Sequence, residues 1–283
     1  MNATPEELLA DVPQSLQAIV SAYWQDWSDA CVDAGIDAAI DLPVMGKIWA
    51  CSDFAALVCS RKPALLRAVL DEGVDTDRDL AAYSARVKAA IEQSVAGPVN
   101  ETAAEAALMH ALRELRQGEM LRLVIRDIAE FADLEQIMAE LSFLAEAMVA
   151  VTLDHLHATA SAQFGTPLDE NGRSQQLLVL GMGKLGGYEL NFSSDIDLIF
   201  GYPQDGQTQG GRSLSIHEFF VRLAQKLIRA LNEITADGFV FRVDARLRPF
   251  GDSGPLVMSF AALEQYYQSQ GRDWERYAMV KAR

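Results

Sequence analysis

Two strand-like runs separated by a very short spacer constrain the fold of the second half of this chain. The first run, LLVLGMGKLGG at residues 177–187, places Gly181, Gly183 and Gly186 at the dinucleotide-binding spacing G-x-G-x-x-G. A dinucleotide fold needs a full crossover helix after these glycines. Only YELNFSS, residues 188–194, precedes the next run, and this spacer is too short for a crossover between parallel strands. The glycines therefore indicate a different kind of phosphate chemistry.

The second run, DIDLIF at residues 195–200, begins with acidic side chains. Asp195 and Asp197 are two residues apart, so on a strand both carboxylates project from one face. Adjacent carboxylates repel each other unless a cation shares them. Mg²⁺ is commonly held by one or two carboxylates together with substrate phosphates. The run therefore predicts a magnesium site on a strand.

A third strand-like segment, FRVDARLRP at residues 241–249, alternates charged and apolar residues. On a strand, its charged residues would share one face: Arg242, Asp244, Arg246 and Arg248. Such a face can simply be the solvated side of a sheet. Beside the two upstream aspartates, however, a third carboxylate completes a site for two metal ions, and arginines neutralise phosphate charge. The predicted catalytic and metal-binding residues are Asp195, Asp197 and Asp244.

Composition divides the chain at a polar segment, GTPLDENGRSQQ, at residues 165–176. Residues 1–164 are rich in Ala, Leu, Glu and Met, and their apolar residues recur at helical spacing, as Leu108 and Leu112 do. Strand-like and helical patterns alternate over residues 177–283. The sequence therefore predicts an acidic helical region, a linker and an α+β domain, in that order.

Charge is distributed unevenly between the two parts. Residues 1–170 carry a net charge of −17, whereas residues 171–283 carry +1. An acidic surface argues against nucleic-acid binding, which needs a basic one. The nearly neutral second part has cationic groups available for a phosphorylated ligand.

The predicted helical region contains a cluster of basic residues. Its members are Arg113, Arg116, Arg122 and Arg126. A cluster with this spacing is typical of a solvated helix face with acidic partners one turn away. Contact with a partner or a phosphate is the alternative interpretation.

Several features favour a cytoplasmic protein that does not enter a membrane. No basic segment followed by an apolar one is found at the N-terminus, and no uninterrupted apolar run is long enough to span a bilayer. Cys31, Cys51 and Cys59 form no C-x-x-C pair, so we expect buried thiols in a reducing compartment. His155 and His157 fall on different faces of a helix, which disfavours a shared metal.

Three stretches carry a resemblance to a known family: GMGKLGGYELNFSSDIDLIF, VFRVDARLRPFGDSGPLVMSF and QGRDWERYAMVKAR. A Gly-Gly pair, a short spacer, Asp-Ile-Asp and a later strand aspartate resemble the nucleotidyltransferase superfamily that includes DNA polymerase beta. The three stretches span roughly residues 177–283 and are similar to the glutamine synthetase adenylyltransferase/adenylyl-removing enzyme family. This resemblance implies a polymerase-beta-like α+β domain, with a mixed sheet flanked by helices and a helical C-terminal segment.

The family carries two nucleotidyltransferase domains in one long chain, and the resemblance favours the N-terminal, adenylyl-removing one. ELNFSSDIDLIF and RLRPFGDSGPLV look like that copy, and the transferase copy usually has Gly where Asn191 stands here. The chain stops inside an apparent helix, so the domain is expected to be cut before its end.

The resemblance implies that adenylylated glutamine synthetase and inorganic phosphate are converted to glutamine synthetase and ADP. It also implies regulation by the PII signal protein and by glutamine. ATP-dependent adenylylation of glutamine synthetase is one alternative. A nucleotidyltransferase-like module that senses a regulator is the other.

Roles for residues around the aspartates follow from the implied reaction. The three carboxylates would hold two Mg²⁺ ions. Gly186 and Gly187 would let backbone N–H groups approach a phosphate at the start of a short helix. Ser194 would add a hydroxyl contact, or serve as a turn or cap residue. The remaining predicted phosphate-binding residues are Lys184, Arg246 and Arg248.

Overall fold

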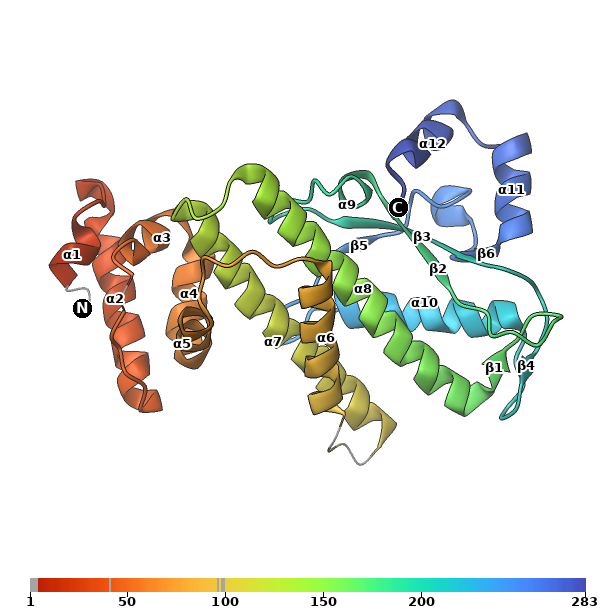
Figure 1. Cartoon of the computed structure of the whole chain (residues 1–283), viewed down its shortest axis with the longest axis horizontal. Coiled ribbons are helices and arrows are strands. Elements are labelled where there is room, and N and C mark those ends of the chain that lie inside the picture. The colour runs from red at the N-terminus through yellow and green to blue at the C-terminus, as the bar shows by residue number, and fades with distance from the viewer. Residues whose placement is uncertain (1–4, 41, 96, 98–99) are drawn as a thin grey trace. The chain divides into compact units, whose positions relative to one another are not determined.

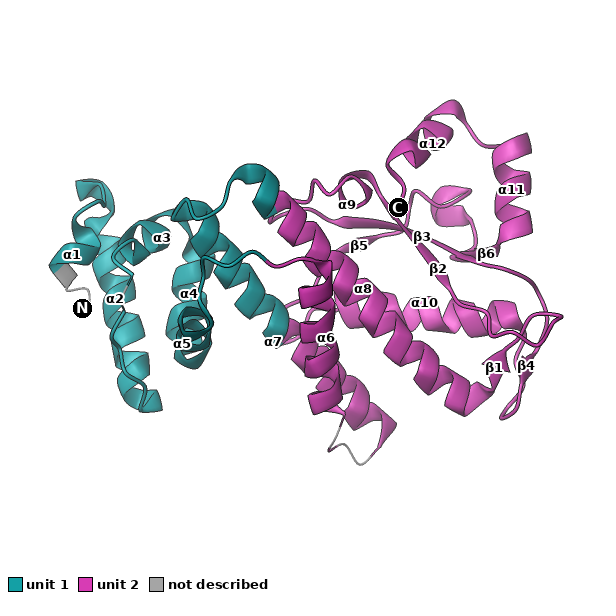
Figure 2. Cartoon of the chain, viewed as in Figure 1, with its two compact units in different colours: residues 1–77, 114–137 teal, residues 78–113, 138–283 magenta. Residues whose placement is uncertain are grey.

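The computed structural model describes residues 5–40, 42–95, 97 and 100–283. The chain forms two compact units, shown in different colours in Figure 2. The first comprises residues 1–77 and 114–137, and the second comprises residues 78–113 and 138–283. Two long helices, α7 (Glu101–Ile128) and α8 (Leu134–Phe164), contribute residues to both units.

The first unit is helical, and local sequence signals set the ends of its helices. Its other members are α1 (Pro5–Leu9), α2 (Gln14–Ala34), α3 (Met45–Cys51), α4 (Asp53–Arg61) and α5 (Pro63–Glu72). The Ser52 hydroxyl caps α4 by accepting a hydrogen bond from the Ala55 amide at 3.2 Å. Helix α2 ends at Gly35, whose φ of 67° lies in the left-handed region that glycine adopts without strain.

Aromatic and thiol side chains fill the core of the first unit. The ring centroids of Trp27 and Trp49, both buried, lie 6.1 Å apart. Cys31 and Cys59 are buried, as predicted, and burial raises the pKa of Cys59 to about 12. Cys51, the last residue of α3, is exposed, so the prediction of a buried thiol is wrong there.

The arginine cluster of α7 is buried. Three of its members are at most 1% exposed: Arg113, Arg122 and Arg126. In the first unit, Arg122 donates to the Thr76 carbonyl at 2.8 Å, and Arg126 donates to the Val74 carbonyl at 3.0 Å. Burial also lowers the pKa of Arg116 to about 10. The solvated face is therefore wrong for these three arginines, because backbone carbonyls take the place of water. The expected acidic partner one turn away is present for Arg122, which pairs with Glu119 at 3.2 Å.

The second unit contains a mixed sheet of four strands, which confirms the predicted fold class. The central strand is β3 (Ile196–Tyr202), visible in Figure 1. Strand β2 (Leu178–Met182) pairs with it antiparallel, whereas β5 (Val243–Asp244) and β6 (Val257–Ser259) pair with it parallel. Because β2 occupies one edge of β3, the two short strands share the other edge, β5 at the start of β3 and β6 at its end.

A second sheet of two strands pairs β1 (Thr166–Pro167) with β4 (Thr208–Gln209). Strand β1 therefore lies within residues 165–176, the segment predicted as a linker. Those residues belong to the second compact unit. The division of the chain made from composition stays a prediction.

Helices surround the sheet in the second unit. They include α6 (Leu80–Ser94), α9 (Gly183–Gly186), α10 (Ile216–Asn232), α11 (Phe260–Ser269) and α12 (Asp273–Ala278). The Ser215 hydroxyl accepts a hydrogen bond from the Glu218 amide at 3.1 Å, so the predicted start of α10 is confirmed. Buried side chains such as Phe220 and Leu227 line the apolar face of α10, which contacts β3, β5 and β6.

Helix α8 is long and apolar. Among the described residues it is the one helix whose length and hydropathy would suffice to cross a membrane, and 56% of its most apolar window is buried inside the protein. A core helix passes the same test, so the observation is weak evidence for a membrane. Within the second unit, the Ser142 hydroxyl of α8 accepts a hydrogen bond from the Leu190 amide at 3.2 Å.

His157 of α8 lies in the core of the second unit, and its titration makes the stability of the protein depend on pH. The ring is buried and packs edge-on against Phe219, with centroids 5.5 Å apart, and neither ring nitrogen has a hydrogen-bond partner. Burial lowers the pKa of His157, with a smaller opposing effect from Asp154. The unfolded chain therefore binds a proton more readily than the folded one. Stability is highest above the unfolded pKa of about 6.5 and falls as the pH drops below it.

We expect His157→Leu to reduce this loss of stability on acidification, because leucine does not titrate. Urea unfolding of both proteins between pH 8 and pH 5.5 measures the effect. Equal pH dependence of the two unfolding free energies would contradict the assignment to His157.

Candidate active site

Pairing of β3 with β5 brings two of the three predicted aspartates together. Asp197 lies directly opposite Asp244 in the parallel register, so the two side chains project from the same face of the sheet. Asp195 immediately precedes β3, and the Ile196 amide donates to the Arg242 carbonyl at 2.9 Å. The structure thus gathers carboxylates that are 47 residues apart in sequence at the start of the central strand.

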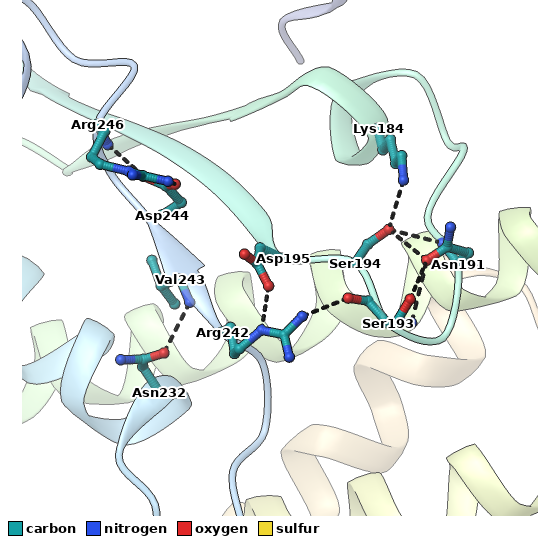
Figure 3. Close-up of polar contacts among 10 residues, drawn as sticks. All are labelled: Lys184, Asn191, Ser193, Ser194, Asp195, Asn232, Arg242, Val243, Asp244 and Arg246. Carbon is teal, nitrogen blue, oxygen red and sulfur yellow. Dashed lines mark hydrogen bonds and ion pairs between the residues drawn. The ribbon is translucent and has the colours of Figure 1, made fainter.

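Arg242 connects Asp195 to the segment before it. Its guanidinium forms an ion pair with the Asp195 carboxylate and donates to the Ser193 carbonyl at 2.6 Å, as Figure 3 shows. The arginine side chain is 54% exposed. Arg242 was placed on the charged face of the third segment but was not among the predicted site residues. Its ion pair spans 47 residues, so local spacing gives no signal for it.

Arg246 makes the equivalent contact with Asp244. Its Nε lies 2.8 Å from the Asp244 carboxylate, and its backbone amide donates to the same carboxylate at 2.8 Å. Hydrogen bonds from Arg246 are the main reason that the pKa of Asp244 lies below its usual value. An outer guanidinium nitrogen of Arg246 also pairs with this carboxylate at 2.5 Å, although the Arg246 side chain is 71% exposed.

Asp197 has the opposite electrostatic environment. Partial burial raises its pKa, and repulsion from Asp244 and then from Asp195 raises it further. Arg246 and Lys184 oppose this rise through their charge. The middle carboxylate is therefore the one whose negative charge is least well compensated.

The charged face predicted for residues 241–249 is only partly present. Strand β5 contains only Val243 and Asp244, so the prediction that Arg242, Arg246 and Arg248 lie on a strand is wrong. The strand ends because the Asp244 carboxylate accepts the Arg246 amide and turns the chain. Arg248 is largely buried and donates to the Ala245 carbonyl at 2.8 Å, so it holds this turn together.

The glycines before β3 also lie at a different place in the short helix from the one predicted. Helix α9 spans Gly183–Gly186, so Gly186 and Gly187 lie at its end rather than at its start. A side chain at Gly186 would meet the Lys281 carbonyl at 1.7 Å, which shows that this glycine permits close backbone packing. Gly183, by contrast, has a φ of 57°, and a Cβ there would lie 3.3 Å from the Asp197 carboxylate.

Lys184 and Ser194 are brought together near the carboxylates. The Lys184 ammonium donates to the Ser194 hydroxyl at 3.4 Å, as seen in Figure 3. That hydroxyl donates in turn to the Asn191 side chain at 2.9 Å and accepts a hydrogen bond from the Asn191 amide at 3.2 Å. Ser194 is therefore a turn residue in this structure, and Asn191 is a supporting residue that sequence reasoning missed. The Asn-x-Ser-Ser sequence is a recognisable turn signal.

Oxygen ligands for a metal are present, but they do not converge on one point. Among the residues that the structure describes, no group of three or more His, Cys, Asp or Glu side chains is close enough to hold an ion. Asp195 is turned towards Arg242, and Asp244 towards Arg246. The donor set nevertheless suits Mg²⁺, because a divalent cation would relieve the repulsion that raises the pKa of Asp197.

Comparison with known proteins agrees with the resemblance carried by the three sequence stretches. Residues 43–283 match the family model described as glutamate-ammonia ligase adenylyltransferase. Three relatives bear the name bifunctional glutamine synthetase adenylyltransferase/adenylyl-removing enzyme. The protein from Thioalkalivibrio sulfidiphilus is 46% identical over the whole of this chain and 29% of its own length. Those from Shewanella oneidensis and Nitrosococcus oceani are each 50% identical, over 82% and 83% of this chain and 24% of their own lengths.

This chain therefore spans less than a third of the relatives that it matches. The family match covers most of the chain, including every strand of the four-stranded sheet. The relatives' shared name confirms the family resemblance inferred from the sequence. The chain belongs to the glutamate-ammonia ligase adenylyltransferase family.

Proposed function

We propose that this site removes AMP from a tyrosine of glutamine synthetase by phosphorolysis. Adenylylated glutamine synthetase and inorganic phosphate would give glutamine synthetase and ADP: phosphate attacks the AMP phosphorus, and the tyrosine oxygen leaves. The relatives' shared name includes both addition and removal of the adenylyl group. The observation that supports removal of AMP is a set of exposed cationic side chains near the three carboxylates. They are Arg242, Arg246 and Lys184.

Phosphorolysis must bring two anions together, namely free phosphate and the phosphodiester of the modified tyrosine. Catalysis of phosphoryl-type transfer relies mainly on positioning and charge stabilisation. Arg242 and Arg246 are more than half exposed, and Lys184 lies beside the same strand. These side chains can orient and neutralise phosphate oxygens.

The attacking phosphate is already an anion, so the reaction needs no strong base. A tyrosine hydroxyl, the nucleophile for addition of AMP, must lose a proton with a pKa of about 10. His217 contacts Tyr202 at the far end of β3, and the other three histidines lie on α7 and α8. Among the described side chains, a base for that step would therefore have to be one of the carboxylates that we propose to hold the metal, whereas an anionic nucleophile needs none.

Mg²⁺ would be held by Asp195, Asp197 and Asp244, and a bound ion neutralises charge on the transferring phosphoryl group. Arg242 and Arg246 each pair with one of these carboxylates and are more than half exposed, so both could also bind phosphate oxygens. Regulation by PII and glutamine, and a cytoplasmic location, belong to this proposal because they are implied by the family.

The proposal predicts which substrates the chain will use. We expect ADP to form when the protein is incubated with magnesium, phosphate and adenylylated glutamine synthetase. We expect no AMP transfer when it is incubated with magnesium, ATP and unmodified glutamine synthetase. Chromatography of nucleotides and the mass of glutamine synthetase measure both reactions.

A mixture that lacks phosphate is the control, because hydrolysis would release AMP rather than ADP. AMP transfer from ATP, without phosphate-dependent ADP formation, would establish the alternative of adenylylation. Binding of nucleotide or regulator with neither reaction would favour a sensing module.

A further inference from the structure

We infer that Arg113 is a positioning residue that holds the Arg242–Asp244 segment against the start of β3. It contacts no substrate and acts through the loop between α10 and β5. The inference rests on the proposed function for its kinetic consequence. Its structural part concerns the order of the β5 segment and can be measured without any substrate.

The guanidinium of Arg113 binds both arms of that loop. It donates to the carbonyl of Ala230 at 3.0 Å and to the carbonyl of Glu233, near the end of α10. It also donates to the Gly238 carbonyl at 2.8 Å, on the arm that returns towards β5. A fourth bond, to the Met109 carbonyl of its own helix at 2.8 Å, fixes the side chain in place. One planar cation therefore joins the end of α10 to the chain that enters the site.

Complete burial makes this connection hard to replace. Arg113 is 0% exposed, and burial lowers its pKa from the ordinary arginine value. Water does not reach the guanidinium, so the carbonyls that it binds would lose a charged donor if it were removed. The bonds to Met109 and Ala230 are buried, and those to Glu233 and Gly238 are partly buried. Leaving a buried carbonyl unpaired is costly, so we expect the loop to rearrange when Arg113 is removed.

Further hydrogen bonds connect the rest of this loop to β5, the strand that carries Asp244. The amides of Val240 and Phe241 both donate to the Leu231 carbonyl, at 2.9 and 3.1 Å. The Val243 amide donates to the Asn232 side chain at 3.1 Å. These bonds fix the chain two residues before Arg242 and one residue before Asp244. A shift at Gly238 therefore displaces the two groups that face Asp195 and Asp197.

A second, exposed contact lies one helical turn away on the same element. His110 of α7 pairs with the Asp237 carboxylate at 2.7 Å, and Asp237 precedes Gly238. The His110 side chain is more than half exposed, so this pair is expected to be weaker than the Arg113 contacts. A substitution that removes the His110–Asp237 pair would therefore disturb the same loop less strongly than loss of Arg113.

The matched comparison is provided by Arg126, on the same helix. Arg126 is equally buried and also binds a backbone carbonyl, that of Val74, but it belongs to the first unit. Arg113→Met and Arg126→Met remove the same chemical group and should both lower stability. Only Arg113→Met is expected to loosen the Arg242–Asp244 segment, which includes β5.

The experiment compares both variants with the unaltered chain at a temperature where circular dichroism shows all three to be folded. For Arg113→Met we expect faster hydrogen exchange of the Ile196 and Val243 amides in the metal-free protein. We also expect Mn²⁺ affinity, measured by electron paramagnetic resonance, to fall about 10-fold or more. The kcat of phosphate-dependent ADP formation should fall about 10- to 100-fold, with a smaller change in KM. Arg126→Met should leave all of these values unchanged.

Equal effects in the two variants, or wild-type exchange and Mn²⁺ affinity in Arg113→Met, would overturn the inference. If Arg113→Met does not fold, Asp237→Asn replaces it. This variant should speed exchange of the Val243 amide and weaken Mn²⁺ binding by a smaller factor, and an unchanged result would refute the positioning role. Absence of ADP formation in the wild-type chain would refute the proposed reaction alone, since exchange and Mn²⁺ binding would still report on Arg113.

Discussion

Asp197→Asn is expected to reduce phosphate-dependent ADP formation by about 10³-fold while leaving stability unchanged or higher. The variant removes the carboxylate that the other two repel and that would share a cation with them. It also removes repulsion that the folded protein bears at neutral pH. Because the pKa of Asp197 is raised, its ionised form costs stability at neutral pH, and asparagine has no such cost. Opposite changes in activity and stability are the mark of a functional carboxylate.

Asp195→Asn should also abolish ADP formation with little effect on folding. The control is Asp252→Asn, since the Asp252 side chain is 77% exposed and lies 3.8 Å from Arg248. Initial rates of ADP release and thermal unfolding of all variants provide the measurements. Near-native phosphorolysis by folded Asp195→Asn would show the metal assignment to be wrong.

Arg126→Met is expected to lower the free energy of unfolding by about 3 kcal/mol. The substitution deprives the partly buried Val74 carbonyl of a charged donor and removes the ion pair with Asp77. Methionine fills part of the space but offers no hydrogen bond. Chemical denaturation gives the difference directly.

Arg222→Met serves as the comparison because Arg222 is half exposed on α10 and pairs with Glu218 one turn away. Exposed pairs of this kind contribute only about 0.5 kcal/mol. Similar losses for the two variants would mean that burial of Arg126 has no special energetic role.

The sheet could be predicted from sequence because its signals are local. A run of apolar residues marks β2, and an acidic pair followed by apolar residues marks β3. The hydroxyl of Ser215 and the amide three residues later define the start of α10. Such features depend on neighbours within a few residues, which the sequence shows directly.

The environment of the arginines could not be predicted, because their partners are distant in sequence. Arg113 binds carbonyls more than a hundred residues away, and Arg122 binds one 46 residues away. The position of Arg246 was missed for another reason. A short-range hydrogen bond from its amide to Asp244 ends the strand, whereas alternation of charge had favoured its continuation.

The packing of residues 281–283 against β2 has a consequence for self-association. The Gly181 amide donates to the Arg283 carbonyl at 2.9 Å, and the Arg283 amide donates back to the Gly181 carbonyl at 3.0 Å. These two bonds occupy part of the edge of β2 that faces away from β3. An uncovered strand edge is a place where a strand from a second molecule can add. Residues 281–283 thus cover a part of β2 that could otherwise pair between molecules.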